Sequence, residues 1–459
     1  ERHRYHRLNQ VQYIALGFFF MILAGSLILT LPIASRSGEW TPFLDSMFTA
    51  TSATCVTGLV VYDTFTHWNV FGQLVILLLI QIGGLGFITV GVGFSMAFRR
   101  RIGLWQRDLL KESINAMEIG GIVKLSRKIF IGTALCEGAG AILLATRFIP
   151  EFGFVKGIYY SIFHAISAFC NAGFDLMGGQ QQYASFTSYA ADPVINIVLM
   201  LLIVVGGLGF VVWSDVVSKR FHWKNYCLHT KMVISVTLIL IFGGALLLFL
   251  FEQGGTIKGM STGEQILTSL FGSVTARTAG FNTVDTGALQ PESKLLTIVL
   301  MFIGGSPGST AGGVKTTTIA VILIYVISNL RGENGCNVFH RRIGDEVIKK
   351  ASMVFCLNLF LGLMSVTLIL ATSNLRMSDV LFEVYSAIST VGMTTGITRD
   401  LNVVGRIVII ILMYCGRIGS MTFALSFVAK PEAKGLSLPE EKNDRIRRNY
   451  EINLNYRNG

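Results

Sequence analysis

Long apolar runs alternate with short polar connections along most of the chain. Val11–Ile33, Phe71–Phe98 and Val403–Ala429 each reach the ~20 residues that a helix needs to cross ~30 Å of hydrocarbon. Shorter, moderately apolar runs lie between such stretches, as at 42–50 (PFLDSMFTA) and 157–169 (GIYYSIFHAISAF). These are too short to cross a bilayer and too apolar for a surface loop. The pattern therefore predicts an all-α integral membrane protein with spanning and re-entrant helices.

A repeat of roughly 110 residues runs through the chain. Its marker is a Ser/Thr-rich approach to one glycine, found in SATCVTGL (52–59), SAFCNAGF (167–174), VTARTAGF (274–281) and SAISTVGM (386–393). A glycine-rich patch follows each marker in the next apolar run, namely IGGLGF (82–87), VGGLGF (205–210), IGGSPG (303–308) and CGRIGS (415–420). The second interval is longer because it holds an insertion at 174–190. Each unit reads as span, short helix, glycine strand and span.

The repeat predicts the domain organisation. We expect four tandem M1-P-M2 repeats, with eight spans and four re-entrant pore helices, in a pseudo-fourfold arrangement around one pore. The expected boundaries are 1–126 for the first repeat with its following loop, 127–229 for the second, 230–350 for the third, 351–429 for the fourth, and 430–459 for a polar C-terminal tail.

The positive charge of the chain predicts its orientation. The net charge is +11, but only 14% of residues are charged and the mean hydropathy is +0.59. Most of the 38 Lys and Arg fall in segments that the repeat places on one side: 1–10, 99–128, 218–231, 331–350 and 430–459. By the positive-inside rule, this bias predicts a multi-pass plasma-membrane protein with cytoplasmic N- and C-termini. The expected partner of this basic chain is the lipid bilayer, not a nucleic acid.

Four glycine strands around one axis predict a path for a cation. Backbone carbonyls can replace the hydration shell of the ion, and glycine places no side chain in the path. The alternative, that these glycines only allow close helix packing or tight turns, explains one of them better than four in register. The expected ion-binding residues are Cys55, Val56, Thr57, Gly58, Cys170, Asn171, Ala172, Gly173, Arg277, Thr278, Ala279, Gly280, Ser389, Thr390, Val391 and Gly392.

These units resemble those of the Trk/Ktr/HKT superfamily of cation translocators over nearly the whole chain, and in particular the KtrB-type membrane subunits of bacterial Ktr systems. Glycine at all four filter positions goes with potassium selectivity in that superfamily, so the resemblance implies K⁺ at the filter carbonyls. It also implies a homodimer that sits on a cytoplasmic ring of RCK-type (KtrA-like) regulatory subunits. ATP or ADP would then bind the partner, and no cofactor is expected in this chain. Activation by Na⁺ is common in the family, and the sequence identifies no Na⁺ site.

The segment GGSPGSTAGGVKTTT (304–318) interrupts the apolar run Leu295–Leu330. One continuous helix over this run would be too long for a bilayer, and each half is too short to span alone. We therefore predict a loop inside one span, level with glycine patches that are expected to lie in intact spans. A phosphate-binding loop is excluded because Val314 separates Gly313 from Lys315, whereas Walker A needs an adjacent Gly-Lys pair.

A polar loop at membrane depth below a filter predicts a gate. In the glycine-rich patch of the fourth repeat, Arg417 occupies the position that Gly305 has in the third. An arginine facing lipid is costly, so Arg417 should face the interior. It could hydrogen-bond the loop carbonyls or, alternatively, brace helix ends without gating. The resemblance supports gating, because KtrB-like proteins carry such a loop and basic residue. The expected gate residues are Gly304, Gly305, Ser306, Pro307, Gly308, Ser309, Thr310, Ala311, Gly312, Gly313, Lys315 and Arg417.

Other polar residues in apolar surroundings are weaker candidates. Glu137 and Asp215 could be cation ligands or proton relays, but pairing of Glu137 with a basic group and a boundary position for Asp215 are favoured. His164 is expected to be a hydrogen-bonded packing residue, and Arg277 to point away from the axis towards a carboxylate. No arrangement of residues indicates an enzyme. The expected function is K⁺ uptake, with a less selective Na⁺/K⁺ channel or a secondary cation transporter as alternatives.

Overall fold

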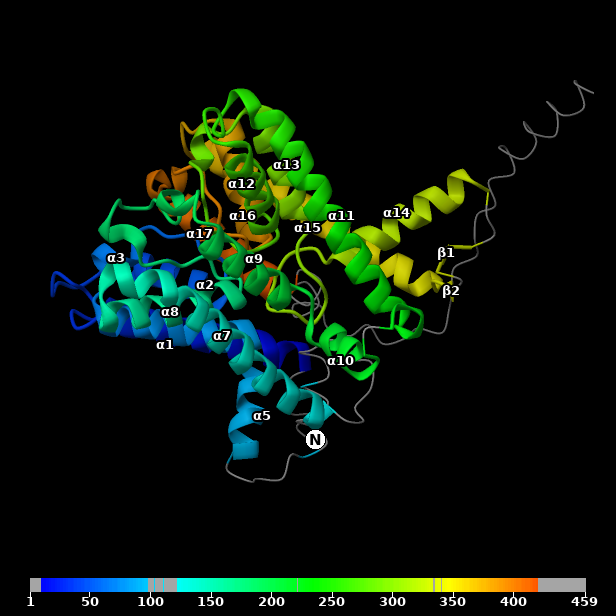
Figure 1. Ribbon diagram of the computed structural model, residues 1–459, viewed down its shortest axis with the longest axis horizontal. Helices are drawn as coiled ribbons and strands as arrows, with labels where there is room; N and C mark the ends of the chain where they lie inside the picture. Colours follow the sequence, from blue (N-terminus) through cyan, green and yellow to red (C-terminus); the bar gives the residue numbers. More distant parts are fainter. Residues whose placement is uncertain are drawn as a thin grey trace, which may run out of the picture.

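The computed structural model is almost entirely helical (Figure 1). Expectations for the N-terminal segment, most of the first basic connection and the C-terminal tail lie outside the described residues. The structure describes residues 10–97, 103, 110, 122–220, 222–332, 335–339 and 341–419.

The first two units follow the expected order of long helix, short helix, glycine strand and apolar helix. The helices of the first unit are α1 (Gln10–Thr30), α2 (Phe43–Thr54), α3 (Thr64–His67), α4 (Val70–Leu85) and α5 (Phe87–Ala97). Those of the second are α7 (Ile122–Phe152), α8 (Phe154–Phe169), η1 (Met177–Gly179), η2 (Thr187–Tyr189), α9 (Pro193–Gly207) and α10 (Phe210–Ser218). The short helices α2 and α8 end just before their marker glycines.

The last two units have the same order, with a small hairpin between them. After η3 (Trp223–Asn225), which ends the second unit, the third contains α11 (Leu228–Phe251), η4 (Glu252–Gly254), α12 (Thr262–Thr275), η5 (Thr286–Ala288), α13 (Pro291–Phe302) and α14 (Thr316–Leu330). The hairpin and the fourth unit contain β1 (Asn337–Val338), β2 (Arg341–Arg342), α15 (Asp345–Thr372), α16 (Met377–Ile388), η6 (Ile397–Asp400) and α17 (Val403–Ile418). In Figure 1 the end of α14 and the hairpin project away from the main bundle.

Several helices can cross a membrane. Among the described residues, the helices that are long and apolar enough are Gln12–Thr30, Val123–Phe152, Leu228–Gly254 and Asp345–Thr372. The helices α9 and α10 qualify together as a pair bent by 95°, and α4 and α14 are shorter apolar helices. The chain is therefore a mostly helical membrane protein with several apolar spans and a bent pair.

The glycine-rich patches break the helices in which they lie. Between α4 and α5, Gly86 has a φ of +82°, and Gly209 between α9 and α10 has a φ of +97°. The helix α17 ends before Gly419, which has a φ of +96°. The expectation of intact spans at these patches is wrong, because a left-handed residue cannot continue an α-helix. Among the described residues, the break between α13 and α14 is longer than those that follow α4 and α9.

The short helices form the centre of the protein. Each one packs against the long helix that precedes it, in the pairs α1 with α2, α7 with α8, α11 with α12 and α15 with α16. Each also contributes at least one fully buried phenylalanine, namely Phe48 in α2, Phe163 and Phe169 in α8, Phe271 in α12 and Phe382 in α16. Burial of such rings stabilises the bundle by about 1.5–3 kcal/mol each. This packing places the C-terminal ends of the short helices next to one another.

Candidate ion-conduction site

The four marker glycines meet in a closed ring. A Cβ atom added to any of them would lie between 2.0 and 2.7 Å from a carbonyl oxygen of the next unit. Gly58 faces the oxygen of Ala172, Gly173 that of Ala279, Gly280 that of Val391, and Gly392 that of Thr57. The contacts follow the order of the units along the chain and return to the first one. Only glycine fits these positions, because any side chain would overlap backbone of a neighbouring strand.

The four glycine strands share an unusual backbone conformation. Each has two left-handed residues, the glycine itself (φ between +70° and +100°) and the residue two positions before it. Those earlier residues are Val56, Asn171, Thr278 and Thr390, with φ between +51° and +73°. A left-handed conformation costs a residue with a side chain roughly 1–2 kcal/mol. Four such residues at equivalent positions indicate that packing between the units imposes the conformation.

Hydroxyl groups fix each strand to its short helix, but the third unit does so differently. Ser52 Oγ accepts a hydrogen bond from Gly58 N (3.0 Å), and Ser386 Oγ accepts one from Gly392 N (3.1 Å). In the second unit, Ser167 Oγ donates to the carbonyl of Phe174 (2.7 Å).

The corresponding position of the third unit is occupied by Val274, which has no hydroxyl. There Thr275 Oγ1 donates to the carbonyl of Phe281 at 2.6 Å. The sequence motif shows that the third unit lacks the serine, but only the structure shows that the hydroxyl of Thr275 takes over its role.

A cavity of about 630 Å³ opens onto one side of the ring. All four marker glycines line it, together with the carboxylates of Asp63, Asp175 and Asp285 and the guanidinium of Arg399. Carboxylates at the rim of a cavity attract cations. We name this cavity the vestibule.

The predicted intramembrane loop, between α13 and α14, contacts the strands at residues that do not line the vestibule. It closes on itself through Gly304 N, which donates to Val314 O (2.9 Å), and Thr316 N, which donates to Gly305 O (3.0 Å). Towards the second unit, Thr310 Oγ1 donates to Phe169 O (3.2 Å), the last residue of α8.

The loop also contacts the strand of the fourth unit. A Cβ atom on Gly312 would lie 2.0 Å from Thr390 Oγ1, and Gly313 packs against Ser389. The loop and the strands are therefore in direct contact. Ser306 N donates to Gly207 O (3.1 Å) and Gly308 O accepts from Phe210 N (2.8 Å), so the loop also contacts the junction between α9 and α10.

Arg417 joins the loop to the first unit. Its Nη1 atom donates to the carbonyl of Thr310, and its Nη2 atom donates to Gly83 O (2.5 Å) and Gly84 O (2.8 Å). The last carbonyls of a helix have no partner within the helix. At the broken end of α4 the guanidinium bonds Gly84 O and shares Gly83 O with Gly86 N. Arg417 thus holds together three segments that are far apart in the sequence.

Lys315 and Arg277, the other two basic residues expected near the ion path, have local partners. Lys315 Nζ donates to the carbonyl of Ala311 (2.8 Å) and is thus bound within the loop. Arg277 is buried and points away from the ring, where its Nη2 atom donates to Thr237 Oγ1 of α11 (3.3 Å). Among the described residues its partner is this hydroxyl, so the expectation of a carboxylate is wrong.

The weaker candidates lie outside the ring. Glu137 accepts from Gln81 Nε2 (3.2 Å), an amide and not the basic group expected. Asp215 forms an ion pair with Lys219 (2.7 Å) in the last turn of α10. His164 is fully buried and bonded to Tyr160 O (2.7 Å) and Leu176 N (3.1 Å), which confirms that it is a packing residue.

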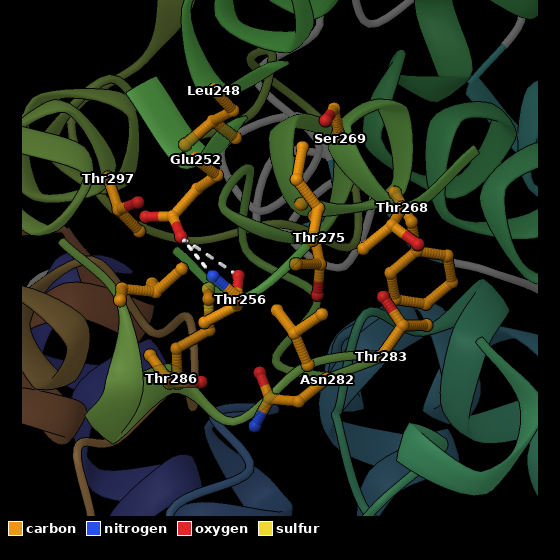
Figure 2. A pocket seen from close by; sticks show the side chains of 16 residues that line it. Leu248, Glu252, Thr256, Thr268, Ser269, Thr275, Asn282, Thr283, Thr286 and Thr297 are labelled. Atoms are coloured by element: carbon orange, nitrogen blue, oxygen red, sulfur yellow. Dashed lines mark hydrogen bonds between the residues drawn. The ribbon is translucent and has the colours of Figure 1, made fainter. Parts of the chain in front are cut away.

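A second, smaller cavity lies beside the third unit (Figure 2). Its volume of about 30 Å³ has room for roughly two water molecules. Figure 2 shows Glu252 at its edge, where one carboxylate oxygen accepts from Thr256 N (2.8 Å) and Oγ1 (2.9 Å). The other oxygen accepts from Gln290 N (2.9 Å). Through these bonds Glu252 anchors the connections around the third strand.

Comparisons with known proteins place this arrangement in one family. The model of the TrkH family, described as cation transport protein, matches residues 2–437. The chain is 43% identical to the potassium/sodium uptake protein NtpJ of Enterococcus hirae, over 92% of this chain and 94% of the relative. It is 40% identical to the Ktr system potassium uptake protein B of Bacillus subtilis, over 95% and 96%. The crystal structure of the potassium transporter TrkH from Vibrio parahaemolyticus has the same fold, with a TM-score of 0.72 at 19% identity, covering 93% of this chain and 87% of that one.

Proposed function

Because this chain belongs to the TrkH family of cation transport proteins, we propose that it is a pore for K⁺ uptake across the plasma membrane. A transporter of this family is not an enzyme. The observation that carries the proposal is the closed ring of glycines, bounded on one side by a carboxylate-lined vestibule and on the other by a polar loop. Relatives named for potassium or potassium/sodium uptake support the choice of ion.

The proposed filter consists of the backbone carbonyls of the four strands, at 55–58, 170–173, 277–280 and 389–392. In this proposal the four units stand in a pseudo-fourfold arrangement, with eight spans and four re-entrant short helices. K⁺ would lose its water to these carbonyls, since carbonyl rings replace the hydration shell of an ion. The shared left-handed backbone supports this, because all four strands then present their carbonyls in the same conformation.

The proposed gate is the intramembrane loop together with Arg417. Its position directly against Thr390 supports this role, as do the bonds of Arg417 to Thr310 and the end of α4. Flow would rise when the loop leaves this position. Deletion of part of 305–314 should therefore increase ion flux, and unchanged flux would contradict the gate.

The proposed partners follow from the name of the Bacillus subtilis relative, which belongs to a Ktr system. We expect a homodimer on a cytoplasmic ring of RCK-type subunits that binds ATP or ADP, with the basic segments of this chain facing the ring and both termini cytoplasmic. We also expect Na⁺ to activate transport by this complex.

The decisive experiment is ⁸⁶Rb⁺ uptake into proteoliposomes that contain the purified protein. Wild-type protein should take up Rb⁺, and external K⁺ should compete with it far better than Na⁺. Equal competition by Na⁺ would favour a less selective Na⁺/K⁺ channel, which the name of the Enterococcus hirae relative makes the second candidate. Absence of uptake from folded protein would contradict the pore. A secondary transporter is the third candidate; the same order of elements in all four units differs from the inverted repeats that many such transporters have.

A further inference from the structure

The insertion of the second unit (174–190) crosses the vestibule and contacts the other units. Tyr183 N donates to Asp63 Oδ2 (3.1 Å), and the Tyr183 hydroxyl donates to Val61 O (3.2 Å), both in the first unit. Phe186 N donates to Asn282 O (2.9 Å) in the third unit. The insertion is thus tied to backbone and carboxylate groups on two sides.

Contact with the fourth unit is made by an arginine. The guanidinium carbon of Arg399 lies 4.3 Å from the centre of the Tyr183 ring, the geometry of a cation–π contact. Arg399 has an exposed side chain and lines the vestibule. No carboxylate of the described residues lies within 4 Å of its guanidinium, so the tyrosine ring is what holds it.

The ring of Tyr183 is itself firmly positioned. Its backbone is left-handed (φ +61°), as is that of Ser185 (φ +49°), conformations that persist only where the surroundings enforce them. The bonds to Asp63 and Val61 supply that enforcement. Because the Tyr183 ring is held in place, it can restrict the position of the Arg399 guanidinium.

We propose that Tyr183 holds the charge of Arg399 against the vestibule wall and thereby sets the apparent affinity for incoming cations. This inference rests on the proposed function of the chain as a cation pore. An arginine released from the ring would move through the vestibule and repel cations on their way to the glycine ring, since charge in a cavity acts over its whole width. Tyr183 is in this sense a positioning residue, and Arg399 is the group through which it acts.

The test separates the ring face from the rest of the tyrosine. In the ⁸⁶Rb⁺ uptake assay, Tyr183→Leu should raise the apparent KM by about two- to five-fold, the factor that corresponds to an exposed cation–π contact. The maximal rate should stay the same. Tyr183→Phe keeps the ring and loses only the bond to Val61, so its KM should stay near that of wild type.

The double variant tests whether Tyr183 acts through Arg399. Arg399→Gln alone should lower the KM, and Tyr183→Leu combined with Arg399→Gln should give the KM of Arg399→Gln. Added N-methylglucamine chloride should reduce the effect of Tyr183→Leu, because salt screens the freed charge. Arg376→Gln is the matched control, an exposed arginine between α15 and α16 that does not line the vestibule.

If the double variant is as impaired as Tyr183→Leu, the insertion only stabilises the fold and the inference is overturned. An unchanged KM in Tyr183→Leu, with normal wild-type uptake, overturns the inference and leaves the proposed pore intact. Absence of uptake by wild type overturns both.

Discussion

The glycine ring and the intramembrane loop lie next to each other but are built in different ways. Each unit contributes one strand to the ring, with the same two left-handed positions and the same close approach to a carbonyl of the next unit. The loop comes from the third unit alone, and it is held by Phe169, Gly207 and Arg417 of other units. Equal contributions suit the proposed filter, in which a ring surrounds an ion, whereas a single contribution suits the proposed gate, which has to move independently.

The glycine ring and the intramembrane loop also differ in the kind of contact that holds them. Contacts in the ring are between backbone atoms, so no rotamer change can relieve an added side chain. Contacts of the loop depend largely on hydrogen bonds, several of them from side chains that a substitution can remove. The ring should therefore be intolerant of change in every unit, while changes at the loop should alter the rate of flow without abolishing it.

The largest effect is expected from a side chain in the ring. Gly392→Ala would place Cβ 2.0 Å from the carbonyl oxygen of Thr57 at a φ of +92°. Left-handed strain of about 1–3 kcal/mol adds to this overlap. We expect at least about a ten-fold loss of Rb⁺ uptake, with each 1.4 kcal/mol worth ten-fold. Gly243→Ala is the control, because its Cβ meets nothing within 4 Å. Equal activity of the two variants would contradict the ring.

The next effect concerns the attachment of the loop. Arg417→Gln removes the bonds to Thr310, Gly83 and Gly84, and hydrogen bonds from a charged donor are worth about 1.5–3 kcal/mol each. We expect uptake to rise by about ten-fold, since the closed position loses at least one such bond. Arg147→Gln, which breaks only the exposed ion pair with Asp192, should leave the rate unchanged. A fall in uptake by folded Arg417→Gln would show that the arginine braces the helices without gating.

A smaller effect should distinguish the third strand from the others. Thr275→Val keeps the shape of the side chain but removes the bond to Phe281 O. One such bond is worth about 0.5–1.5 kcal/mol, so the preference for K⁺ over Na⁺ should fall by about two- to ten-fold. Thr275→Ser, which keeps the hydroxyl, should retain the preference. Competition by Na⁺ in the Rb⁺ uptake assay measures this preference in both variants.

The smallest effect should appear in the vestibule as a pH dependence. Burial raises the pKa of Asp175 to about 7, while the bond from Met177 N opposes this and the nearby Asp63 adds to it. Asp175 is therefore charged above pH 7 and neutral below it. We expect the KM for Rb⁺ to rise by about two-fold between external pH 8 and pH 6, because one attracting charge is lost. Asp175→Asn should have the higher KM at both values; a full pH dependence in this variant would assign the titration to another group.

Much of this protein is determined by the sequence alone. Apolar runs of ~20 residues have no stable place except a bilayer, and the four markers with their glycine patches define the units whatever their arrangement in space. The break at 304–318 also follows from length, because neither half of that run can span alone. These features depend on residues close together in the chain.

The tertiary structure decides what depends on distant residues. The four glycines lie roughly 110 residues apart, and only packing of the short helices brings each one against a carbonyl of the next unit. The same packing imposes left-handed backbone on Val56 and Thr390, which favour other conformations locally. It also gives Arg417 its carbonyl partners at the broken end of α4, a break that a run as apolar as Phe71–Phe98 does not reveal. Composition and spacing specify the parts, and contacts between units fix their conformation.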